Sequence, residues 1–114
     1  MKAAALLAAA MIVLSAGGAC ADAADEIAHL IDAVRHSPCL FLRNGEAYAG
    51  TEAADHIAMK YRSQKDEIAT AEDFITRAAS RSLQSGRPYQ IACPGEAAVP
   101  ASEWLQARLR ELRN

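Results

Sequence analysis

Polar side chains occur at two places with spacings that could support chemistry. The first is a run of aspartates and histidines at intervals of four, three and four residues: Asp25, His29, Asp32 and His36. These intervals place the run on one face of a helix, and carboxylate and imidazole groups together can bind Zn²⁺. Four ligands spread over three turns cannot converge on one ion, so the pattern favours a solvated face with aspartate–histidine pairs. We therefore expect neither a metal site nor a cofactor.

The second place is a group of arginines. Arg77 and Arg81 lie one helical turn apart, and Arg87 follows in the next loop, with serines nearby. Such a group could hold a phosphate or a carboxylate-rich partner. A charged helix face exposed to solvent is the more common explanation. His56, one turn after Glu52, could likewise be part of a surface pair or a partly buried imidazole.

Residues 85–89 read Ser-Gly-Arg-Pro-Tyr, which is similar to the loop motif of the periplasmic lysozyme inhibitors. In such a loop Ser85 and Arg87 would engage acidic catalytic groups, and an acidic protein would suit a cationic partner. Those inhibitors are β-barrels or sandwiches, however, whereas this chain has mainly helical patterns. The alternative is structural: Gly86 ends a helix, Pro88 leads into a strand and Tyr89 packs.

No catalytic motif is found in the chain. The sequence lacks a nucleophile elbow, a P-loop, a dinucleotide fingerprint and a zinc-protease motif. The formal net charge is −2, which excludes a nucleic-acid binder driven by electrostatics. We therefore expect a binding protein that is not an enzyme, whose partner is an unknown protein or a small anionic ligand. A cell-wall hydrolase is the partner in the alternative, inhibitory interpretation.

The first 21 residues have the pattern of a secretory signal peptide. Lys2 is followed by an apolar run that ends at Leu14, and small residues lead to a cleavage site near Ala21. The run is shorter than the about 20 residues that a membrane span requires. Cys20 could mark a lipoprotein, but Gly17 stands where a lipid anchor signal requires a large aliphatic residue. We expect a soluble periplasmic protein with one domain at 22–114.

Two cysteines, Cys39 and Cys93, remain in the expected mature chain. In an oxidising compartment an even number of cysteines predicts a disulfide. Closing a loop of about 55 residues would stabilise the fold by about 4 kcal/mol in the chain-entropy model. Large apolar residues are scarce in this short chain, so such a link has a clear purpose.

The hydrophobic pattern predicts an α+β fold with about four helices. Asn44-Gly45 between apolar runs predicts a hairpin over 39–48 that pairs Arg43 with Glu46. Residues 88–93 form a third strand, and the register that joins the two cysteines also pairs Phe41 with Ile91. We therefore expect a three-stranded antiparallel sheet. Because Leu40 and Leu42 are also apolar, both of its faces should be covered.

Helices are predicted at 22–36, from Thr51 to about Gln64, from Thr70, and from Ser102 to the C-terminus. Thr51 and Ser102 are the expected N-caps of their helices, and Thr70 with Asp73 resembles a capping box. In the last helix the apolar spacing predicts that Leu112 is buried.

Several segments in this order resemble a known family: Phe41–Gly45, Glu52–His56, Thr70–Ile75, Ala79–Ser82 and Ser85–Tyr89. They are similar to the YfeK-like family of exported bacterial proteins of unknown function, over roughly residues 41–95. The resemblance implies export and a shared fold but supplies no mechanism. Independently of this resemblance, the candidate binding face consists of Arg43, Glu46, Arg77, Arg81 and Arg87, with His56 as a further contributor. In the inhibitory alternative, the loop residues Ser85, Arg87 and Tyr89 make the contact.

Overall fold

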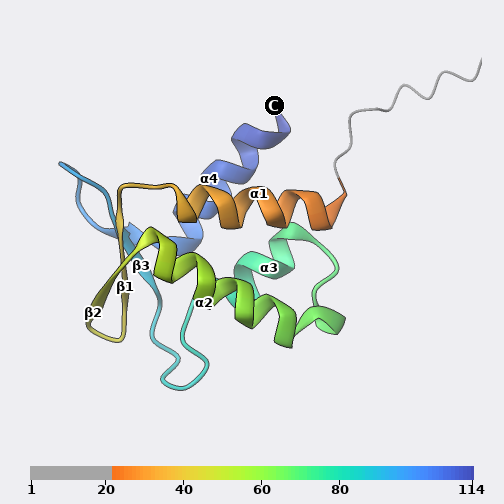
Figure 1. Cartoon of the computed structure of the whole chain (residues 1–114), viewed down its shortest axis with the longest axis horizontal. Helices are drawn as coiled ribbons and strands as arrows, with labels where there is room; N and C mark the ends of the chain where they lie inside the picture. Colours follow the sequence, from red (N-terminus) through yellow and green to blue (C-terminus); the bar gives the residue numbers. More distant parts are fainter. Residues whose placement is uncertain (1–21) are drawn as a thin grey trace, which may run out of the picture.

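The computed structural model describes residues 22–114, so the predicted signal peptide lies outside the described residues. In this part the chain forms four α-helices and a four-stranded antiparallel sheet of order β2-β1-β3-β4 (Figure 1). The elements in chain order are α1 (Ala23–Arg35), β1 (Leu40–Arg43), β2 (Glu46–Ala49), α2 (Gly50–Ser63), the short 3₁₀ helix η2 (Lys65–Glu67), α3 (Ala71–Ala78), β3 (Gln90–Ala92), β4 (Val99–Pro100) and α4 (Ala101–Arg113). The predicted α+β class is confirmed.

The β1–β2 hairpin has the predicted turn. Asn44 and Gly45 both have positive φ, 51° and 83°, as a type I′ turn requires. Arg43 is paired with Glu46, and β3 lies against the other edge of β1 with Ile91 opposite Phe41. The predicted disulfide between Cys39 and Cys93 is present, directly beyond the paired ends of these strands.

The sheet has one strand more than predicted. Gly95, with φ of 76°, reverses the chain after β3, so that Val99 pairs with Ile91. The resulting β4 has only two residues and includes Pro100. Proline cannot donate a backbone hydrogen bond and is therefore tolerated at an edge such as this one.

Two helices begin with a side-chain cap and two do not. The Asp22 side chain accepts a hydrogen bond from the Asp25 backbone N–H, and Thr70 and Asp73 form the predicted capping box. The predictions of Thr51 and Ser102 as N-caps are wrong. β2 and β4 continue directly into α2 and α4, so the N-caps lie two residues earlier than predicted, at Ala49 and Pro100.

All four helices gather on one side of the sheet (Figure 1). The side chains of Phe41 and Ile91 are buried against them in a core that includes Phe74, Leu30 and Leu105. The prediction that both faces are covered is wrong, because Leu40 on the opposite face is 48% exposed. No helix in the described range is long and apolar enough to cross a membrane.

The last turn of α4 also differs from the prediction, because Leu112 is exposed. Arg113 forms ion pairs with Glu26 of α1 and Glu72 of α3, with an Nε–Oε2 distance of 2.8 Å to Glu26. Leu112 lies beside Leu30 and Ala33 of α1 at the edge of the core, in the last turn of α4, and is therefore only partly covered.

Candidate functional site

The hairpin supplies the first two residues of the candidate site. Side chains alternate between the two faces of a strand, so Arg43 leaves β1 on the same face as Phe41. Tyr48 of β2 is paired with Phe41 and lies on that face as well. The Arg43 guanidinium lies 4.5 Å from the centre of the Tyr48 ring, which is a cation–π distance.

Helix α2 supplies His56 and Lys60, which are one turn apart. Ala53, Ile57 and Lys60 recur at the spacing of a single helix face, and all three are buried. Lys60 is only 5% exposed. Its Nζ donates to the backbone carbonyl of Arg81 at 2.8 Å and to the Tyr89 hydroxyl at 3.0 Å. The lysine thus lies inside the fold, where its position in the helix directs it.

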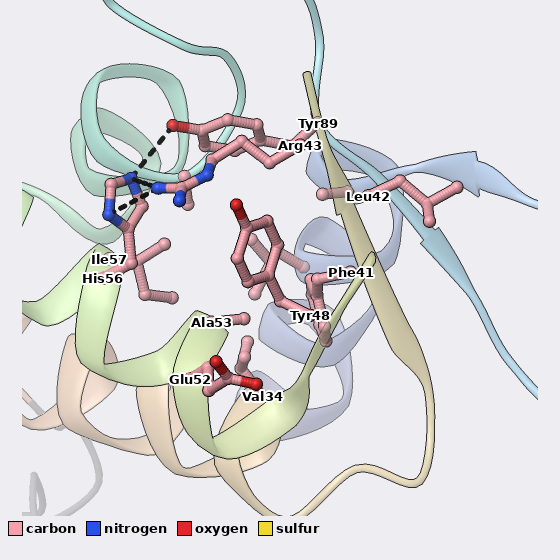
Figure 2. A pocket seen from close by; sticks show the side chains of 13 residues that line it. Val34, Phe41, Leu42, Arg43, Tyr48, Glu52, Ala53, His56, Ile57 and Tyr89 are labelled. Atoms are coloured by element: carbon pink, nitrogen blue, oxygen red, sulfur yellow. Dashed lines mark hydrogen bonds between the residues drawn. The ribbon is translucent and has the colours of Figure 1, made fainter. Parts of the chain in front are cut away.

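Tyr89 joins the two halves of the site. It lies just before β3 and is 6% exposed, and its hydroxyl is 3.3 Å from Nε2 of His56. On the other side, Nη1 of Arg43 lies 2.7 Å from each ring nitrogen of His56 (Figure 2). A guanidinium can only donate hydrogen bonds, so one nitrogen of this imidazole must accept. The arrangement requires that His56 be neutral.

The electrostatics of these residues follow from burial and from the two neighbouring cations. Burial lowers the pKa of Lys60 to about 8, and the Arg43 charge adds to this effect. The pKa of His56 is lowered by burial and by the charges of Arg43 and Lys60. Burial raises the pKa of Tyr89, which the Arg43 charge opposes. Within residues 22–114 every ion pair involves other arginines, so neither Arg43 nor Lys60 has a carboxylate partner.

Two adjoining cavities surround this cluster of Arg43, His56, Lys60 and Tyr89. One has a volume of about 200 Å³ and is mainly apolar, and Figure 2 shows it with Arg43, His56 and Tyr89 at its upper end. The other, of about 540 Å³, is more polar and lies on the Lys60 side. Arg43, Tyr48, His56 and Tyr89 line both cavities. Two cationic groups at a cavity that have no carboxylate partner in the described part of the chain can bind an anion through charge-assisted hydrogen bonds.

Residues 21–113 match the model of a family of unknown function, DUF5329. The chain belongs to this family. A relative of this DUF5329 protein, the uncharacterized protein YfeK of Salmonella typhimurium, is 43% identical over 49 residues. The match covers 43% of this chain and 41% of the relative, so it spans less than half of the relative's length. No solved structure matches the chain significantly.

The fold of this chain brings together about half of the predicted binding residues. Arg43, His56 and Tyr89 form the cluster described above. Glu46 lies beside the polar cavity, where its carboxylate accepts a hydrogen bond from the Tyr48 hydroxyl at 2.7 Å. Arg81 contributes only its backbone carbonyl, because its side chain is exposed.

The remaining predicted residues lie outside the cluster. Arg77 is exposed and pairs with Glu67 at 3.0 Å. The Ser85 hydroxyl donates to the side chain of Asn44 at 2.7 Å, which ties the loop to the hairpin turn. Arg87 is exposed beside a separate cavity of about 300 Å³ near that turn. The loop at 85–89 therefore presents Arg87 to solvent but keeps Tyr89 buried.

Sequence reasoning missed Lys60 and Tyr48. Both left a signal: Lys60 follows Ile57 by three residues on an otherwise apolar helix face, and Tyr48 pairs with the inward-facing Phe41. On the predicted solvated face of α1, the His36 ring lies 3.0 Å from the Asp32 backbone carbonyl rather than pairing with its carboxylate. No group of three potential metal ligands is found within the described residues.

Proposed function

We propose that this protein is a soluble periplasmic binding protein, without enzymatic activity, that holds a small anionic ligand between Arg43 and Lys60. The observation that carries the proposal is the pair of cations at a cavity, neither of which has a carboxylate partner within residues 22–114. A buried charge is costly unless it is paired. An anionic ligand would supply the missing partner.

His56 and Tyr89 support binding rather than catalysis in this proposal. His56 is held by Arg43 and Tyr89, and within residues 22–114 it has no hydrogen bond to a serine or cysteine that it could activate. Tyr89 accepts a hydrogen bond from Lys60 and thereby fixes the direction of the ammonium group. Both residues would hold the two cations in position before the ligand arrives, which reduces the entropy lost on binding.

Anion binding is tested by NMR titration of the folded protein with acetate and with inorganic phosphate in the millimolar range. We expect saturable shifts of the Arg43 and His56 signals. Arg43→Gln should weaken binding at least about tenfold, the effect of removing one charge-assisted hydrogen bond. The matched control is Arg77→Gln, which removes an exposed arginine outside the site. Equal binding by the two variants would contradict the proposal.

Export is tested separately from binding. The Cys39–Cys93 disulfide supports an oxidising compartment, because such bonds are rare in the cytosol. Protein recovered from a periplasmic extract should begin near Asp22 when its N-terminus is sequenced. Recovery of the uncleaved chain from the cytoplasm alone would contradict this part of the proposal.

A further inference from the structure

The apolar cavity beside the cluster carries a further inference about the ligand. Its wall is formed by core side chains together with three buried alanines: Ala53, Ala79 and Ala101. An alanine side chain ends at its Cβ, so three of them leave space that larger residues would fill. An engineered apolar cavity of about 150 Å³ binds benzene. The volume of about 200 Å³ here is thus sufficient for a ring or a short hydrocarbon chain.

The two ends of this cavity differ in charge. Arg43, His56 and Tyr89 lie at one end, and the Glu52 carboxylate lies at the other, one helical turn before His56 (Figure 2). Between them the wall is apolar, with Val34, Phe41, Ile57 and Leu105 among its residues. An anionic group is attracted to the Arg43 end and repelled at the Glu52 end. The cavity therefore favours a ligand with one anionic head and an uncharged tail.

We propose that the ligand is an amphipathic anion. Its carboxylate or phosphate head lies against Arg43 and Lys60, and its tail, about the size of one ring or a short acyl chain, fills the cavity lined by Ala53 and Ala79. This inference rests on the proposed anion-binding function and specifies the class of ligand. Burying one methylene group raises affinity about fourfold. Affinity should therefore increase with the length of the tail until the cavity is full.

The test is a titration with straight-chain carboxylates: acetate, butyrate, hexanoate and octanoate. The single tryptophan, Trp104, packs edge-on against Phe41 of the cavity wall at a centroid distance of 6.1 Å. Its fluorescence should therefore change when a ligand tail fills the cavity. We expect about a fourfold gain per methylene from butyrate onwards, followed by a plateau. Ala79→Leu, which fills the cavity, should abolish this gain, so that octanoate binds this variant no more tightly than acetate does. A comparison of hexyl phosphate with heptanoate, which has an alkyl tail of the same length, determines whether the site prefers a phosphate or a carboxylate head.

Wild-type measurements keep the inference testable even if Ala79→Leu does not fold. Binding of acetate and octanoate with equal affinity, both weakened by Arg43→Gln, would overturn the amphipathic ligand and leave the anion site intact. Hexanol that binds as tightly as hexanoate would show a cavity without an anion site and overturn the proposed function. Absence of binding by every carboxylate and by hexyl phosphate would overturn both.

Discussion

Lys60 is the residue at which the fold is expected to be most sensitive to pH. Its pKa in the folded protein is about 8, below its ordinary value of 10.5. Between these two values the unfolded chain binds more protons than the folded chain, so the free energy of unfolding rises with pH. The difference between these two pKa values lowers the free energy of unfolding at neutral pH by about 3 kcal/mol. About 2 kcal/mol of this should return between pH 7 and 9.5.

Methionine at position 60 removes the buried charge and keeps a side chain of similar length. The change also removes the hydrogen bonds to the Arg81 carbonyl and the Tyr89 hydroxyl, a loss of about 1 kcal/mol each. At pH 7, removing the buried charge raises the free energy of unfolding by about 3 kcal/mol, which exceeds the about 2 kcal/mol lost with the two hydrogen bonds. At pH 9.5, removing the charge raises the free energy of unfolding by only about 1 kcal/mol, which is less than the loss from the two hydrogen bonds. Lys60→Met should therefore be more stable than wild type at pH 7 and less stable at pH 9.5.

Urea unfolding at pH 7 and pH 9.5, with the disulfide intact, measures both free energies. The matched control is Lys65→Met, which removes an exposed lysine from η2 and should change stability by less than about 0.5 kcal/mol at either pH. If the stabilities of wild type and Lys60→Met differ by the same amount at both pH values, the ammonium group is fully solvated. That result would refute the reasoning about a buried cation.

Two further predictions concern the scaffold. A Cβ at Gly50 would collide with the backbone carbonyl of Val34 in α1, so Gly50→Ala should lower the free energy of unfolding by about 2 kcal/mol in the urea assay. The control is Thr51→Ala, at an exposed neighbour that is not the N-cap, which should change this free energy by less than about 0.5 kcal/mol. Replacing Cys39 and Cys93 by alanine opens a loop with a sequence separation of 54 and should lower stability by about 4 kcal/mol. Dithiothreitol should reproduce this loss of stability in wild type and leave the stability of the double variant unchanged. If dithiothreitol does not lower the stability of wild type, the prediction is contradicted.

Elements with a strong local signal were predictable from the sequence. Asn44-Gly45 determines the hairpin turn, because type I′ geometry requires positive φ at both positions. Once the hairpin is in register, pairing Phe41 with Ile91 places the two cysteines together. These predictions needed only neighbouring residues and one long-range constraint, the disulfide.

Features that depend on which face a neighbour covers were not predictable in this way. Leu40 has the same apolar character as Phe41, and only the arrangement of four helices on one side of the sheet leaves it exposed. The same applies to Leu112, which shares a helix face with the buried Leu105 and Leu109 but lies in the last turn of α4, where it stays exposed. Arg43, His56 and Tyr89 were candidates on chemical grounds, but they lie far apart in sequence, and no pattern indicates that they meet.

The combination of Lys60 and the apolar cavity gives the strongest reason to regard this part of the fold as functional. Lys60 is buried with no carboxylate partner within residues 22–114, and its pKa of about 8 corresponds to a cost of about 3 kcal/mol at neutral pH. A cavity walled by Ala53, Ala79 and Ala101 forgoes packing that larger side chains would supply. Two independent losses of stability coincide in a short chain with few large apolar residues, and such local departures from good packing are expected at functional sites. A ligand that brings an anionic head and an apolar tail offsets both losses at once, because binding to the folded state alone raises stability.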